Sequence, residues 1–217
     1  MAARFPTVFK FGPGFILGAI MAFTPVLAQA QDPKAPPSAK QKKLPEAPAK
    51  LPKVGADRTR GLDFLFGALK AAPDDASARH VEARIWALWT QTPSDTTSLL
   101  MFRANAAMEA KKMDVALKLL DAVVKLKPDY VEGWNRRATL FYLQNEYARS
   151  LEDIQQVLVR EPRHFGALTG LGMIMQELGD DKRALDAFRK ALAVDPRLDK
   201  IPELVKTLTE KVEGRDI

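Results

Sequence analysis

The chain has 217 residues, of which 28% are charged and 47% are hydrophobic, a composition typical of a globular protein. It contains no cysteine, which excludes disulfides, thiolate metal sites, a cysteine nucleophile and a lipid anchor attached through cysteine. The formal net charge is +6, so the location of the basic residues decides whether a nucleic-acid partner is indicated.

Residues 1–30 have the pattern of a secretory signal peptide. Arg4 and Lys10 form a basic start, an apolar run follows at 15–23, and Ala28 and Ala30 stand at the small-residue positions of a cleavage site. The run is shorter than the roughly 20 residues of a membrane span. We expect cleavage after Ala30, a periplasmic location, and no stable membrane span after cleavage. Retention of the segment as a membrane anchor is the alternative.

Residues 31–60 form a basic, proline-rich segment with six prolines, eight basic residues and three acidic ones. A segment with so few apolar residues cannot bury enough surface to offset the entropy of ordering, which predicts a disordered linker. The segment carries a net charge of +5, whereas residues 61–217 carry −1. The basic charge therefore belongs to the N-terminal segments, and a nucleic-acid partner is not indicated for the folded part.

A repeat of 34 residues follows, marked by Pro128, Pro162 and Pro196. Each of the windows 97–130, 131–164 and 165–198 holds two amphipathic runs split by a turn, which predicts a helix hairpin that ends before the proline. Large and small residues recur at matching positions. They are Leu100, Trp134 and Leu168 at position 4; Ala104, Ala138 and Gly172 at 8; Ala116, Ser150 and Ala184 at 20; Leu120, Ile154 and Phe188 at 24; and Val123, Val157 and Ala191 at 27.

Less regular segments flank the three windows. Residues 61–96 contain two helical runs around a turn at Pro73, which predicts a degenerate first unit, with Trp86 and Trp89 on one helix face as core residues. Residues 199–217 contain one amphipathic run that ends at Gly214. Because stacked hairpins expose an apolar face at each end, we expect both segments to act as caps.

The pattern of the three windows resembles the tetratricopeptide repeat (TPR). The resemblance implies an all-α fold, an α-solenoid of stacked antiparallel hairpins with about four TPR-like units (61–96, 97–130, 131–164 and 165–198) and a C-terminal capping helix. In this family the first helices of the hairpins line a concave groove that binds peptides. The resemblance therefore implies a protein-protein interaction adaptor, and together with the signal peptide it predicts another envelope protein or peptide as the partner.

The family's groove positions, carried over to this chain, give candidate binding residues. Asparagine side chains can hold a peptide amide from both sides, and methionine and tyrosine offer adaptable apolar contact. The alternative is a solvated helix face without a partner. The candidates are Met101, Asn105, Met108, Asn135, Thr139, Tyr142, Thr169 and Met173, and the family's second position adds Ser98, Glu132 and Gly166.

Two departures from the family limit the inference. A subtype that clamps a C-terminal carboxylate needs a set of basic and asparagine side chains, of which this chain keeps only Asn105; Gly166 and Gly170 stand where the last two basic residues would be. Arg103 and Arg137 occupy position 7, where the family prefers leucine. They are a candidate anionic contact, and pairing with acids such as Asp121, Glu152 or Asp153 is the favoured alternative.

The sequence shows no acid-base or nucleophile constellation, so we expect no enzymatic activity and no cofactor. His80 and His164 lack the ligand spacing of a metal site. A second functional hypothesis is an envelope tether in which the basic linker binds anionic lipid or wall polymer and the helical domain acts as a spacer.

Overall fold

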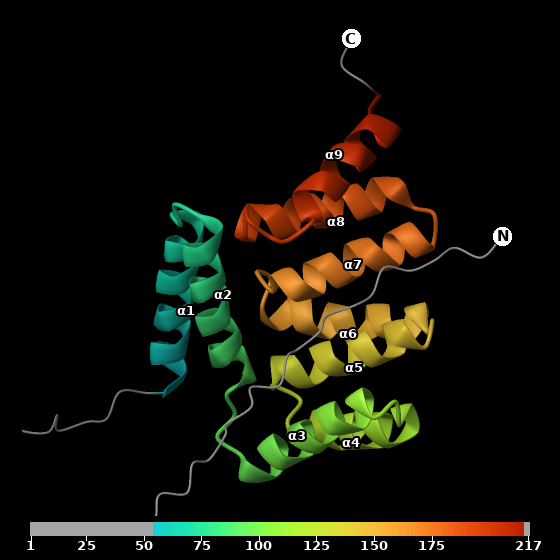
Figure 1. The fold of residues 1–217 in the computed structure, drawn as a ribbon. Helices are drawn as coiled ribbons and strands as arrows, with labels where there is room; N and C mark the ends of the chain where they lie inside the picture. The colour runs from blue at the N-terminus through green and yellow to red at the C-terminus, as the bar shows by residue number, and fades with distance from the viewer. Residues whose placement is uncertain (1–53, 215–217) are drawn as a thin grey trace, which may run out of the picture. The chain divides into compact units, whose positions relative to one another are not determined.

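The computed structural model describes residues 54–214, and side chains from Arg58 onward. The predicted signal peptide and most of the predicted linker lie outside this range. The described residues form helices and connecting turns (Figure 1). None of these helices is long and apolar enough to cross a membrane. The helices are α1 (Val54–Lys70), α2 (Asp75–Thr90), α3 (Asp95–Glu109), α4 (Met113–Leu126), α5 (Val131–Leu143), α6 (Tyr147–Arg160), α7 (Phe165–Glu177), α8 (Asp181–Val194) and α9 (Ile201–Val212).

Three hairpins, α3–α4, α5–α6 and α7–α8, coincide with the three sequence windows. Consecutive hairpins pack on each other through α4 with α5 and α6 with α7. The helices of a hairpin approach closely where small residues were predicted: a Cβ built on Gly172 would lie 2.5 Å from the Phe188 ring, and Ser150 Oγ donates a 2.8 Å hydrogen bond to the Ala138 carbonyl. The expected arrangement of stacked hairpins is confirmed for these six helices.

The turn inside each hairpin has the same geometry. Lys111, Asn145 and Gly179 occupy equivalent positions, and all three have a positive φ, of 57°, 60° and 75°. The next residue in each turn donates from its backbone N–H to the carbonyl five residues earlier, which closes the end of the first helix. Glycine adopts this left-handed conformation without steric cost, whereas a lysine side chain is unfavourable there.

The loops that follow the three hairpins account for the fixed 34-residue interval of the prolines in this chain. Each second helix ends two residues before its proline, at Leu126, Arg160 and Val194. The residue before a proline is driven out of the helical conformation, and proline cannot donate to a helix hydrogen bond. The first two loops therefore end one hairpin and begin the next, and the third ends the last hairpin and leads into α9.

Helix α9 caps the C-terminal end of the stack, as the sequence predicted. It packs on α8 through Ile201 and Leu208, which are buried, while Leu204, Val205 and Val212 complete the apolar stripe. Residues of its opposite side, including Glu203, Lys206 and Thr207, are exposed. An amphipathic helix with a polar outer face closes the apolar end of a repeat stack.

The hairpin α1–α2 differs from its predicted role in two ways. Helix α1 begins at Val54, inside the segment predicted to be a linker, and Arg58 Nη2 in that extension donates to the Trp89 carbonyl at 3.4 Å. The hairpin also does not stack on α3 as a first unit would. It packs against α5 and against the loop segments that precede α7 and follow α8. The expectation of an N-terminal cap was therefore wrong.

Candidate peptide-binding surface

The first helices of the three hairpins, α3, α5 and α7, present most of the predicted groove residues on one surface, which we call the first-helix surface. Thr139 is exposed, Met173 is 40% exposed, and Asn105, Met108, Tyr142 and Thr169 are half-buried. Direct packing between α5 and α7 makes this surface continuous across those two hairpins. Chemically, it combines adaptable apolar groups with hydroxyl and amide groups.

Met101 does not belong to this surface. Its side chain is only 7% exposed and packs in the core of the first hairpin with Ala104 and Leu120. Sequence position alone placed Met101 on the groove. In the absence of a stacked preceding hairpin, an apolar side chain at this position contributes to the core of its own hairpin.

Acidic residues mark one end of the first-helix surface. Glu109 and Glu177 are exposed near the C-terminal ends of α3 and α7. Burial, the charge of Glu177 and the neighbouring Tyr147 together raise the pKa of Tyr142. The Tyr142 and Tyr147 rings lie 5.9 Å apart. This end of the surface suits an apolar ligand that carries a positive charge.

The other end of the surface is covered by α2. Glu132 and Gly166, which stand at the second groove position of their repeats, lie at the N-terminal ends of α5 and α7. The Glu132 side chain is fully buried, and the Trp86 ring lies 2.9 Å from a Cβ built on Gly166. A ligand on the first-helix surface therefore cannot extend over these two positions while α2 is in place.

A buried polar network lies beneath α2. The Glu132 carboxylate accepts a 3.0 Å hydrogen bond from Asn135 Nδ2 and forms an ion pair with Arg136 Nε at 2.9 Å. His164 Nε2 lies 3.5 Å from the same carboxylate. The other ring nitrogen of His164 accepts the backbone N–H of Ala167 and so caps α7. The amide nitrogen of Asn135 thus donates to an internal carboxylate, and the amide oxygen of Asn135 remains available to a ligand.

Aromatic rings join this network to the hairpin α1–α2. The Trp89 ring stacks on the His164 ring at 4.0 Å with an interplanar angle of 13°. Tyr130 donates its hydroxyl to the Thr90 carbonyl at 2.9 Å, and burial together with the charge of Glu132 raises the pKa of Tyr130 to about 12. The sequence predicted Trp89 as a core residue, but it gave no sign that its partners would be His164 and Phe165, more than seventy residues away.

Ion pairs hold the same hairpin to the loops between repeats. Arg163 Nη1 lies 2.6 Å from Asp63, and Arg197 Nη1 lies 2.7 Å from Asp75. Arg197 also donates to the Ala72 and Pro73 carbonyls in the α1–α2 turn. An open depression of about 250 Å³ lies at this junction, lined by Asp63, Phe66, Gly67, Lys70, Arg163 and Val194, and is distinct from the first-helix surface.

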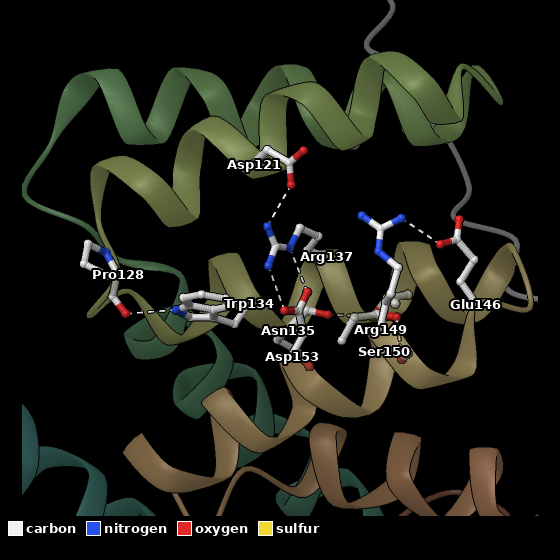
Figure 2. A network of polar contacts seen from close by, with 11 residues as sticks. Asp121, Pro128, Trp134, Asn135, Arg137, Glu146, Arg149, Ser150 and Asp153 are labelled. Carbon is white, nitrogen blue, oxygen red and sulfur yellow. Dashed lines mark hydrogen bonds and ion pairs between the residues drawn. The ribbon is translucent and has the colours of Figure 1, made fainter.

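The two arginines at position 7 have different environments. Arg137 makes a bidentate contact with Asp153 at 2.8 Å and reaches Asp121 of the preceding hairpin at 2.7 Å (Figure 2). These hydrogen bonds raise the pKa of Arg137 against the effect of burial. Arg137 is therefore an internal ion-pair residue, as the alternative proposed. Arg103 is exposed and forms no ion pair within residues 54–214.

Comparison with known proteins agrees with this architecture. A tetratricopeptide repeat family model matches residues 103–154 and 136–198. A TPR repeat-containing protein of Rhizobium etli is 42% identical over 153 residues, which is 70% of this chain and 75% of that protein.

Solved structures show the same fold at low sequence identity. The first TPR domain of Spaghetti (RPAP3) bound to an HSP90 peptide superposes with a TM-score of 0.53 at 14% identity and covers 56% of this chain and 97% of that one. MamA superposes with a TM-score of 0.52 at 17% identity and covers 77% of this chain and 89% of that one. With the repeat pattern, the stacked hairpins and the Rhizobium relative taken together, the chain belongs to the tetratricopeptide repeat proteins.

Proposed function

We propose that the protein is a non-enzymatic adaptor of the bacterial cell envelope that binds an extended segment of a partner protein on the first-helix surface. The observation that carries this proposal is the chemistry of that surface. Asn105 and Thr139 offer hydrogen-bonding groups, and Met173 and Tyr142 offer apolar contact. An extended peptide needs both kinds of contact, and Thr139, Tyr142 and Met173 supply them on the continuous part of the surface that α5 and α7 form.

The surface favours an internal or basic segment over a C-terminal carboxylate. Gly166 and Gly170 lack the basic side chains of the family's carboxylate clamp, and Trp86 covers Gly166. The exposed carboxylates Glu109 and Glu177 repel an anionic chain end. The ligand that fits is therefore a segment with apolar side chains and at least one lysine or arginine.

The envelope location rests on the signal-peptide pattern of residues 1–30 and its predicted cleavage after Ala30. The absence of cysteine does not distinguish the envelope from the cytoplasm, so the location is tested separately. N-terminal sequencing of the exported protein should give Gln31 as the first residue. Recovery of Met1 would favour the anchored alternative.

The binding proposal is tested by crosslinked pull-down from envelope extracts with the full chain as bait. The double change Asn105→Ala, Met173→Ala should weaken recovery of the partner about tenfold or more, because both side chains are accessible on the proposed surface. Gln155→Ala, an exposed change on the second helix of another hairpin, is the matched control and should leave recovery unchanged.

Deletion of residues 31–53 separates the adaptor from the tether. An adaptor keeps its affinity after this deletion and responds weakly to salt. If the deletion abolishes binding, and binding by the intact chain fades with salt while the Asn105→Ala, Met173→Ala variant binds normally, the basic segment holds the partner and the tether replaces the adaptor.

A further inference from the structure

The N-terminal end of the repeat stack exposes an apolar stripe on α3. The corresponding face of the later first helices is covered by the preceding hairpin. Leu140 of α5 and Ile174 of α7 are fully buried, and a Cβ built on Gly133 would lie 2.7 Å from Val123 of the preceding hairpin. On α3 the equivalent positions, Leu99 and Ala106, are exposed, because α1–α2 does not stack there.

Two large side chains make this stripe unusual for a solvent-facing helix. Leu99 is 49% exposed and Phe102 is 71% exposed. They lie three residues apart and therefore on the same side of α3. The opposite end of the stack has no such feature, because α9 presents polar residues outward. Among residues 54–214, the N-terminal end of the stack is thus the uncapped end.

The stripe also carries two opposite charges at a symmetric spacing. Asp95 lies four residues before Leu99, and Arg103 lies four residues after it, so the three side chains form one ridge. Both charged residues are exposed, and neither forms an ion pair within residues 54–214. One repeat later, the equivalent Arg137 pairs with Asp153 of its own hairpin and with Asp121, which the covering helix supplies.

We propose that the occupant of this stripe is the α3 stripe of a second copy of the chain, packed antiparallel about a twofold axis that passes near Leu99. This arrangement places Asp95 of each copy opposite Arg103 of the other, so both ion pairs form together. It also covers Leu99 and Phe102 with apolar groups of the partner. A C2 interface requires a surface of this self-complementary kind.

The stripe is separate from the first-helix surface, so the pairing does not depend on the proposed binding function. The interface covers one helix face and is small, which predicts a weak, concentration-dependent dimer. A helix from a different protein would need to bring its own acidic group for Arg103, whereas a second copy supplies Asp95 at the matching distance. For this reason the second copy is the occupant that the charges favour.

The lack of cysteine in the natural chain gives a direct test. Leu99→Cys in the full chain places a single thiol near the proposed axis, and mild oxidation should yield a disulfide-linked dimer on a non-reducing gel. Val159→Cys is the matched control, since Val159 is an apolar residue that is 71% exposed on α6. We expect a dimer yield from Leu99→Cys about tenfold above the control at equal concentration.

The ion pairs are tested in the Leu99→Cys background by charge exchange. Arg103→Asp alone and Asp95→Arg alone should each lower the dimer yield several-fold, and the two changes together should restore it. The proposal is overturned if Leu99→Cys stays monomeric or dimerises no better than Val159→Cys. It is also overturned if the single charge changes have no effect, or if the double change fails to restore the dimer while circular dichroism shows every variant folded.

Discussion

The helices that flank the three repeats are α1–α2 on one side and α9 on the other. Their sequences have similar amphipathic patterns, but the structure docks them on different kinds of surface. Helix α9 continues the stack and covers α8 with an apolar stripe. The hairpin α1–α2 leaves the N-terminal end open and packs on the inter-repeat loops through Trp89, His164 and Phe165. An amphipathic pattern therefore establishes that a segment buries one face, but not which surface it is buried against.

The difference has a physical origin in the type of contact that each segment makes. Helix α9 packs aliphatic side chains on α8, and its ion pairs, Lys211 with Asp181 and Glu213 with Arg189, join it to this same neighbouring helix. The hairpin α1–α2 combines stacked rings with ion pairs such as Arg163 to Asp63 and Arg197 to Asp75, which require particular partners. Directional contacts of this kind specify one docking site, so substitutions in the two flanks should have distinguishable effects.

The largest effect is expected for Trp89→Ala. The Trp89 side chain is 1% exposed and packs on Phe66, Trp86, His164 and Phe165, so its removal should cost about 3–5 kcal/mol of unfolding free energy. Release of α1–α2 should also open residues 91–94 to limited proteolysis. Chemical denaturation and peptide mapping measure the two effects.

Matched changes sharpen this test. Phe64→Ala removes another aromatic ring of the same hairpin, but this ring is 73% exposed, so its stability change should stay within about 0.5 kcal/mol. Leu208→Ala in α9 should cost about 2–5 kcal/mol and open the loop after α8 to proteolysis instead. If Trp89→Ala and Leu208→Ala give the same cleavage pattern, the two flanks are not independently docked.

A change inside the stack should have an intermediate effect. Ala184 is fully buried in the core around the α7–α8 hairpin, and Ala184→Leu should overpack this core and cost about 1–3 kcal/mol. The cleavage pattern of both flanks should stay as in the wild type at low denaturant. A thermal melt equal to that of the wild type would contradict the close packing of this hairpin.

Substitutions of two asparagines distinguish a residue that supports the docked hairpin from a residue that is available for ligand binding. Asn135→Ala removes the donor to the buried Glu132 carboxylate and should cost about 1–3 kcal/mol. Asn105→Ala removes a half-buried amide that has no such partner within residues 54–214, and should change stability by about 0.5 kcal/mol or less. Equal melting temperatures for the two variants would show that the Glu132 contact contributes nothing.

The sequence predicted the repeat architecture because its signals are local. Small residues at positions 8 and 20 and prolines at position 32 act within one hairpin, and Gly172, Ser150 and Pro162 have the roles that their positions indicate. The docking of α1–α2 could not be predicted, since it joins residues up to 125 positions apart. The groove was predicted in part: Met173 and Thr139 lie on the surface, whereas Met101 is in the core.

The pH dependence of the docked hairpin is the smallest expected effect, and it arises from Glu82 of α2. This carboxyl faces Asp195, a buried residue at the C-terminal end of α8. Burial and the interaction with the Asp195 carboxylate raise the pKa of Glu82 from 4.5 to about 7, and Arg79 opposes the shift. The docked hairpin therefore holds a proton that the released hairpin gives up. Its stability contribution is fully present below pH 4.5 and is lost as the pH rises through about 7. Glu82 is partly exposed and solvent screens the carboxyl pair, so we expect a loss of about 1–2 kcal/mol between pH 5 and pH 8. The measurement is the denaturation midpoint at both pH values, compared with Glu82→Gln, which cannot ionise and should lack this part of the pH dependence.

Glu203→Gln, an exposed change on α9, is the matched control and should keep the wild-type profile. If Glu82→Gln retains the full pH dependence, the carboxyl pair does not link docking of α1–α2 to proton binding.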